Sequence, residues 1–172
     1  MMLRIISAIA ALTLVAACSS DPETGATNTG AGGSTTTAPA APVQTSSITP
    51  GSLEDFVVNV GDRVYFDTDS SSLSTTAQDT LAKQAAWLRA YPSVNITVEG
   101  HADERGTREY NLALGDRRAN AAKNYLVSQG VSAGRVNTIS YGKERPVALG
   151  SNEEAWAQNR RAVAVPSNVP AS

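Results

Sequence analysis

The chain has 172 residues, with 14 lysines and arginines against 16 aspartates and glutamates, and a formal net charge of −2. This length suits one domain with appendages, and the slightly acidic balance argues against nucleic-acid binding, which rewards clustered positive charge. One cysteine excludes an intramolecular disulfide, and one histidine excludes a multi-histidine metal site.

Residues 1–17 have the parts of a secretory signal peptide. Arg4 supplies a basic start, and Ile5–Ala17 is almost continuously apolar or small. A membrane-spanning helix needs about 20 such residues, and this run is shorter. We therefore expect a segment that is removed during secretion.

Cys18 follows Val15-Ala16-Ala17 and precedes a polar segment. This pattern resembles a bacterial lipobox, and the resemblance implies that Cys18 becomes the lipidated N-terminus of the mature protein. Two or more acyl chains give stable anchoring, whereas one gives only marginal binding. Because Ser19 rather than an aspartate follows the cysteine, the resemblance points to the outer membrane. The alternative is an ordinary signal peptide in which Cys18 is incidental.

Residues 18–47 form a linker of mainly Ser, Thr, Gly, Ala and Pro, in which Val43 is the only large aliphatic residue. Such a segment cannot bury enough apolar surface to offset the entropy of ordering, so the composition predicts disorder. Fully extended, it would reach about 100 Å. We interpret it as a tether between membrane and domain; a tail without a spacing role is the alternative.

A folded domain is expected over residues 48–167, followed by a tail at 168–172. Apolar residues between Val57 and Phe66 predict a β-rich stretch with a turn at Gly61-Asp62, and a second turn is predicted at 67–71. Apolar spacing then predicts a helix from Ser74 or Thr75 to about Ala90. The residues expected on its buried face are Leu81, Gln84, Ala85 and Leu88.

The second half of the domain continues with alternating strands and helices. Val94, Ile96 and Val98 alternate as a half-buried strand that ends at Gly100. A helix is predicted over 109–128, closed by Gly130, then a strand over 136–141, a short helix over 153–159 and a last strand over 161–165. We expect Pro166 to end the pairing of that strand, at a sheet edge with small side chains. The order predicts an α/β sandwich with helices packed on one mixed sheet.

The polar loop after Gly100 is the best candidate for a binding site, because binding groups concentrate in loops held by a rigid scaffold. Asp103 lies in this loop and Arg118 lies two to three turns into the following helix, and Gly100 and Gly106 allow the backbone to bring them together. The two side chains would form either a plain salt bridge or a site for a zwitterion, with the carboxylate for an ammonium and the guanidinium for a carboxylate. Spacing alone leaves both alternatives open.

The same stretch resembles the OmpA-like family of peptidoglycan-binding domains. The matching segments are 64–67, 100–107, 110–112, 114–115, 117–120, 139–146 and 159–163. The resemblance implies an OmpA-like α/β sandwich in which Asp103 and Arg118 hold the meso-diaminopimelate of the stem peptide, whose free end is an amino-acid zwitterion. It also implies that Asn111 braces the site, and it places four further positions at the pocket: Phe66, Asp67, Leu114 and Arg117.

The resemblance further implies a lipoprotein in the inner leaflet of the outer membrane that tethers this membrane to the wall without catalysis or cofactor. It implies the Tol–Pal envelope system, which serves envelope integrity and cell division, with TolB and other Tol proteins as partners. Two alternatives remain. The same pocket would serve another envelope assembly, such as a secretion or motor complex, or Asp103 or Glu104 would act in a peptidoglycan hydrolase.

Two residue types invite other interpretations. His101 lies beside Asp103 and Glu104, but a metal site would need further ligands, so we expect no metal and assign His101 a hydrogen bond that braces the loop. Trp87 and Trp156 are expected as core or shielding aromatics.

Overall fold

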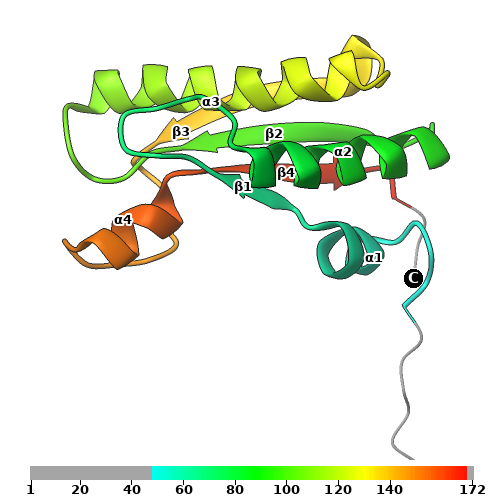
Figure 1. Ribbon diagram of the computed structural model, residues 1–172, viewed down its shortest axis with the longest axis horizontal. Coiled ribbons are helices and arrows are strands. Elements are labelled where there is room, and N and C mark those ends of the chain that lie inside the picture. The colour runs from blue at the N-terminus through cyan, green and yellow to red at the C-terminus, as the bar shows by residue number, and fades with distance from the viewer. Residues whose placement is uncertain (1–47, 170–172) are drawn as a thin grey trace, which may run out of the picture. The chain divides into compact units, whose positions relative to one another are not determined.

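The computed structural model describes residues 48–169 (Figure 1). The predicted signal peptide, the lipidation site Cys18 and the predicted disordered linker lie outside the described residues. The helices are α1 (Leu53–Asp55), α2 (Thr75–Ala90), α3 (Arg108–Ser128) and α4 (Glu153–Asn159), and the strands are β1 (Arg63–Tyr65), β2 (Asn95–His101), β3 (Val136–Gly142) and β4 (Arg161–Ser167). Within residues 48–169, no helix combines the length and apolarity needed to cross a bilayer.

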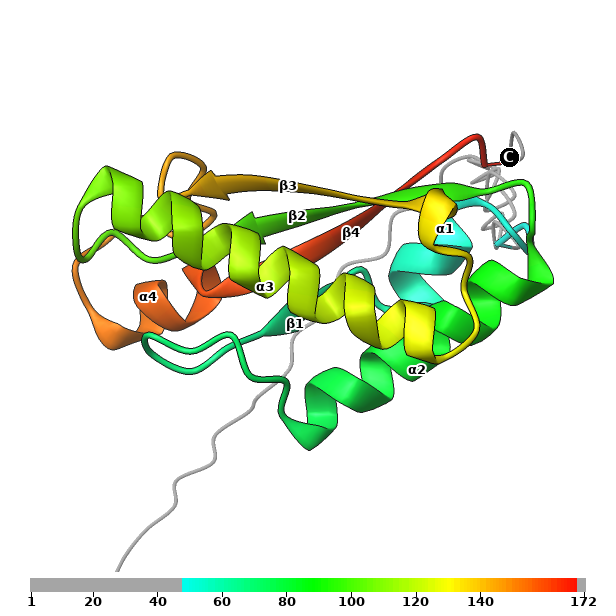
Figure 2. The same ribbon diagram turned by 90° about the horizontal axis from the view of Figure 1, so that it is seen from above.

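The four strands form one mixed sheet in the order β1-β4-β2-β3. β2 and β3 are parallel, whereas β4 runs antiparallel to both of its neighbours, β1 and β2. Helices α2 and α3 lie side by side over one face of this sheet (Figures 1 and 2). The predicted α/β sandwich on a mixed sheet is therefore confirmed.

Helix α2 forms where the apolar spacing predicts it. The Ser74 side chain caps its start by accepting a hydrogen bond from the amide of Ala77 at 3.2 Å, and Tyr91 and Pro92 follow its end. The predicted inward face is buried: Leu81, Gln84, Ala85 and Leu88. The apolar members of this face join the inward residues of β2 and α3 in one core, whereas Gln84 donates to the carbonyl of Gly61 at 2.7 Å.

The segment before β1 is helical, so the prediction of a β-rich stretch from Val57 is wrong for its first part. Ser52 caps α1 by accepting from the amide of Asp55, and one turn of π-helix, Phe56–Val60, follows. Phe56 is completely buried against the ring of Trp87, with 4.9 Å between ring centroids. Burial of this ring outweighs the β preference of the neighbouring valines, because strand propensity depends strongly on tertiary context.

The prediction that Pro166 ends the pairing of β4 at a sheet edge is also wrong. β4 is a central strand that continues to Ser167, and Pro166 lies opposite Ile96 of β2. The amide of Ala164 donates toward the β1 side, to the carbonyl of Asp62 at 2.7 Å. Alternate amides of a strand point the same way, so the hydrogen that proline lacks would point to this side, where the chain has not yet entered β1. The missing donor therefore costs no ladder bond with β2.

Candidate functional site

The loop between β2 and α3 is held close to the helix that follows it. A Cβ at Gly100 would lie 1.8 Å from the carbonyl oxygen of Gly115 in α3, so only glycine allows this approach of strand and helix. Gly106 has a φ of +88°, which other residues rarely adopt. Thr107 then caps α3 by accepting from the amide of Tyr110 at 3.2 Å. These constraints place the loop beside the first turns of α3.

Asp103 is 7 % exposed, and its carboxylate lies between two arginines. Arg105 Nη2 is 2.6 Å from Asp103 Oδ2, and Arg105 also donates to Oδ1 from Nε and from its backbone amide. Arg160 Nη1 lies 3.5 Å from Oδ2. Burial alone would raise the pKa of Asp103, but the hydrogen bonds and charge of Arg105, with the help of Arg160, lower this pKa below its ordinary value. Asp103 is therefore anionic at neutral pH.

Arg118 is completely buried behind this loop. Its guanidinium donates to three backbone carbonyls: Nε to Ser70 at 2.8 Å, Nη1 to His101 at 2.8 Å and Nη2 to Asp67 at 3.0 Å. It also lies 5.2 Å from the centre of the Phe66 ring. Burial lowers the pKa of Arg118 to about 10, which leaves it charged at neutral pH. Arg118 thus ties the turn after β1 to the end of β2.

The salt-bridge alternative for Asp103 and Arg118 does not hold, because the ion pairs of Asp103 are with Arg105 and Arg160. Among the described residues, Arg118 has no carboxylate oxygen within 4.0 Å. Its hydrogen-bond partners are backbone carbonyl groups, because the turn after β1 and the end of β2 meet at this point. Asp103 still adds to the electrostatic stabilisation of the Arg118 cation.

A cavity of about 280 Å³ opens at the loop, and we call it the loop cavity. Its main lining residues are Asp69, Asp103, Arg105, Tyr110, Asn111 and Leu114. Carboxylate and guanidinium groups therefore stand next to each other in an open cavity. This arrangement matches the two charges of an amino-acid head group.

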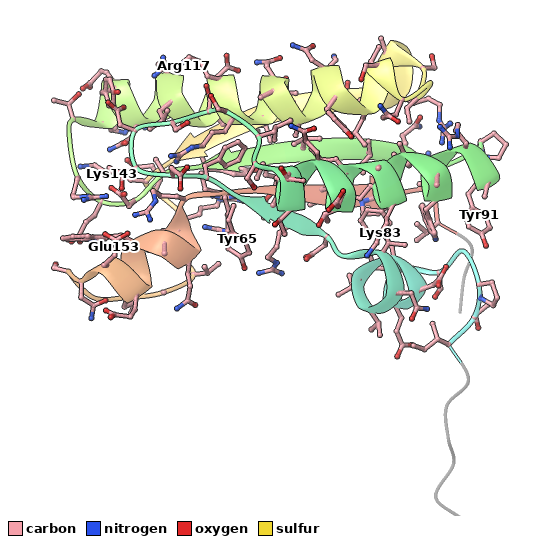
Figure 3. All side chains as sticks on the ribbon, in the orientation of Figure 1. Tyr65, Lys83, Tyr91, Arg117, Lys143 and Glu153 are labelled. Carbon is pink, nitrogen blue, oxygen red and sulfur yellow. The ribbon has the colours of Figure 1, made fainter. Side chains whose placement is uncertain are left out.

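The predicted site residues are divided between this cavity and its surroundings. Asn111 and Leu114 line it, and Asn111 braces the loop by donating to the carbonyl of Arg105 at 2.7 Å. Arg117 is exposed on α3 (Figure 3), with its guanidinium 5.8 Å from the centre of the Tyr110 ring. Phe66 and Asp67 line a neighbouring cavity of about 370 Å³, the edge cavity, together with a set that includes Tyr65, Ser72, Ser74, Gln158 and Arg160.

Arg105 is the residue that the sequence prediction missed. It lines the loop cavity, contacts Asp103 and stacks 4.2 Å from the centre of the Trp156 ring. Its side chain is 38 % exposed, so it is the accessible cation of this site, whereas Arg118 is buried. Its position two residues after Asp103, between Gly100 and Gly106, was the only available signal.

The expected loop-bracing hydrogen bond from His101 is absent from the described part of the chain. Both ring nitrogens are buried without a hydrogen-bond partner, although Glu99 Oε2 lies 3.5 Å from Nε2. The backbone carbonyl of His101 makes the brace instead, by accepting from Arg118. Burial, with the charges of Arg161 and Arg145, lowers the pKa of His101 to about 4. Residues 48–169 contain no group of three or more His, Cys, Asp or Glu side chains that could hold a metal ion.

The chain is similar in sequence to proteins of one family. The model of the OmpA family matches residues 65–160. The chain is similar to the peptidoglycan-associated lipoprotein of Agrobacterium fabrum, with 66 % identity over 119 residues, 69 % of this chain and 67 % of the relative. The same-named protein of Brucella melitensis is 63 % identical over 117 residues, 68 % of this chain and 70 % of the relative.

Solved structures of the same fold are also similar to this chain. The crystal structure of the peptidoglycan-associated lipoprotein from Burkholderia pseudomallei is 47 % identical, with a TM-score of 0.60, and the match covers 62 % of this chain and 90 % of that one. The C-terminal domain of Helicobacter pylori MotB, at 23 % identity and a TM-score of 0.59 over 62 % of this chain and 84 % of that one, shares the fold.

Proposed function

Because the chain belongs to the OmpA family, alongside the peptidoglycan-associated lipoproteins, we propose that it binds peptidoglycan non-covalently. The observation that carries this proposal is the loop cavity, where the anionic Asp103 stands beside the accessible guanidinium of Arg105. The free end of meso-diaminopimelate carries an ammonium and a carboxylate. Each charge thus has a counter-charge at the cavity.

In the proposed complex, Asp103 accepts hydrogen bonds from the ligand ammonium. Arg105 turns from Asp103 to the ligand carboxylate, since its side chain is partly exposed and the ligand ammonium takes its place at Asp103. Arg118 holds the carbonyls of Asp67, Ser70 and His101 in place and adds positive charge from behind the loop. Three of its five N–H groups are used in this way.

The pocket residues inferred from the family have graded roles in this proposal. Asn111 keeps the loop in position, Leu114 forms the apolar floor, and Arg117 acts at the rim through Tyr110. Phe66 and Asp67 form the wall between the loop cavity and the edge cavity. The role is binding, and we propose no reaction and no cofactor.

The wider role is that of a tether between the outer membrane and the wall. Lipid on Cys18 would hold one end in the inner leaflet of the outer membrane, the linker would span the gap, and the domain would capture stem peptides. Many weak sites facing a polymeric ligand gain strength by multivalency. We place this tether in the Tol–Pal system, with TolB contacting the rim of the loop cavity; a secretion or motor assembly is the alternative, and co-purification of TolB separates the two.

The test is sedimentation of the purified full chain, kept in detergent, with diaminopimelate-type sacculi. Wild type should sediment, whereas Asp103→Ala, shown by circular dichroism to be folded, should stay in solution. Asp116→Ala, an exposed aspartate on α3, is the matched control and should behave like wild type. Sedimentation of folded Asp103→Ala at the wild-type level would place the wall contact elsewhere, and release of soluble wall fragments would indicate a hydrolase.

A further inference from the structure

The edge cavity has a volume of about 370 Å³, against about 280 Å³ for the loop cavity, and the proposed complex assigns no part of the ligand to it. It lies along the outer edge of β1, between the start of α2 and the end of α4. Figure 3 shows Tyr65 on β1 and Glu153 on α4 at this end of the domain. Its polar and aromatic lining residues include Tyr65, Asp67, Ser72, Ser74, Gln158 and Arg160.

The two cavities share a wall. Arg160 lines the edge cavity, and its Nη1 is 3.5 Å from Oδ2 of Asp103, which lines the loop cavity. The chain also passes directly from one cavity to the other, because Phe66 and Asp67 line the first and Thr68 and Asp69 line the second. A ligand longer than one amino acid would thus reach from the loop cavity into the edge cavity.

The charges of the edge cavity favour a neutral ligand. The Arg160 guanidinium is already used: Nη2 lies 2.6 Å from Glu153 Oε1, Nε donates to the carbonyl of Phe66 at 3.1 Å, and Nη1 faces Asp103. The cavity wall also carries the Asp67 carboxylate. An anionic ligand would find no free cation there and would meet a like charge, which is unfavourable.

The uncharged groups of the cavity suit a carbohydrate. Tyr65 is 50 % exposed, which leaves aromatic surface available for contact with an apolar ring face. Ser72, Ser74 and Gln158 add hydroxyl and amide groups. The Ser74 hydroxyl uses only a lone pair in capping α2, so its hydrogen remains a donor. Ligand sites typically combine such apolar surface with a few orienting polar groups.

We propose that the edge cavity is a second subsite, which binds an N-acetylated sugar of the glycan strand while the loop cavity holds the stem peptide. This inference rests on the proposed function. In the wall, two amino acids separate diaminopimelate from the sugar, and when extended they span at least about 7 Å. The domain would thus recognise the junction of peptide and glycan, rather than the peptide alone.

The experiment compares two ligands by calorimetry with the full chain in detergent. One is the tripeptide of the stem that ends in meso-diaminopimelate, and the other is the same tripeptide joined to its disaccharide. We expect the disaccharide to improve wild-type affinity about tenfold, equivalent to about 1.4 kcal/mol. Tyr65→Ala should abolish this gain and leave the tripeptide affinity within about twofold, whereas Tyr65→Phe, which keeps the ring, should retain it.

Equal affinity of wild type for the two ligands would overturn the subsite, as would a gain that survives Tyr65→Ala. A loss of tripeptide affinity in folded Tyr65→Ala would assign the edge cavity to the peptide and would also overturn it. The neutral disaccharide alone, with its lactyl group amidated as in the wall, separates this inference from the proposed function. If the tripeptide fails to bind, the proposed function fails; disaccharide binding that Tyr65→Ala abolishes would still support the subsite, and its absence would overturn both.

Discussion

The two ends of α3 border regions of opposite chemistry. Near its C-terminal half, Leu81, Leu88 and Leu126 are buried among apolar neighbours and need no specific partner. Near its N-terminal half, Asp103, Arg118 and Arg160 are buried with almost every polar group matched to a hydrogen-bond partner. The apolar region stabilises the fold by removing surface from water, whereas the polar region depends on the geometry of its hydrogen bonds. We call the polar region, around the loop between β2 and α3, the loop end. Its polar groups can be used for ligand binding while the apolar region keeps the fold.

The largest expected effect is in the apolar region. Leu88 has no exposed surface, so Leu88→Ala should lower the free energy of unfolding by about 2–5 kcal/mol, through lost burial and the cavity left behind. Urea denaturation measures this loss. Leu149→Ala, at an 88 % exposed leucine, should change stability by less than about 0.5 kcal/mol. Wall binding per folded molecule should stay at the wild-type level in both variants.

Arg118 tests whether the loop end is merely a binding surface. Arg118→Ala should cost about 2–3 kcal/mol of stability, because the carbonyls of Asp67, Ser70 and His101 lose their donors. Arg117→Ala, the exposed neighbour on the same helix, should cost under about 0.5 kcal/mol. If the two variants unfold at the same urea concentration, Arg118 has no structural role and acts only on the ligand.

Features that depend on residues close together in the sequence were predictable, and contacts between distant residues were not. The bounds of α2, α3 and α4 were predictable because caps such as Ser74 and periodic apolar residues are local. The pairing of Asp103 with Arg160 was not, since 57 residues separate them and the contact exists only after β4 joins the sheet. For the same reason, composition gave no sign that three carbonyls would surround Arg118.

The helix at 53–60 shows that a local preference can also predict the wrong element. Its valines favour a strand, and only the packing of Phe56 on Trp87 reveals why the chain coils there. Pro166 was misjudged because its neighbours were unknown: it lies in a central strand, beside the part of the chain that precedes β1. In both cases the sequence showed the local preference correctly, and the tertiary partner decided the outcome.

The next effect concerns His101, whose two ring nitrogens are buried without a hydrogen-bond partner. Its pKa is about 4 in the folded protein and near 6.5 in the unfolded chain. The unfolded chain therefore binds the proton first as the pH falls, and stability is lost between about pH 6.5 and 4. Between pH 8 and pH 5 the loss should be about 2 kcal/mol.

Urea titrations at the two pH values measure this loss, and His101→Gln should remove most of it. Asp103 does not contribute in this window, because its pKa is below the ordinary value and its carboxylate keeps its charge. An unchanged pH dependence in His101→Gln would assign the loss to other groups.

A smaller effect is expected in ligand affinity at Asp103. Asp103→Asn preserves the shape of the side chain and removes the charge, so affinity for the diaminopimelate tripeptide should fall at least about tenfold. Asp116→Asn on the exposed face of α3 is the control and should bind like wild type. Calorimetry on both variants gives the comparison, and equal affinities would remove Asp103 from the site.

The smallest effect shows whether Arg105 or Arg118 recognises the ligand carboxylate. Amidation of the free diaminopimelate carboxylate removes the charge that Arg105 would meet, and because that guanidinium is partly exposed, affinity should fall only about two- to fivefold. Arg105→Gln should bind the acid and the amide equally, since the discriminating cation is gone. If Arg105→Gln still prefers the acid by the wild-type factor, the carboxylate is recognised by the buried Arg118, and the turn at 67–70 must move to let the ligand reach it.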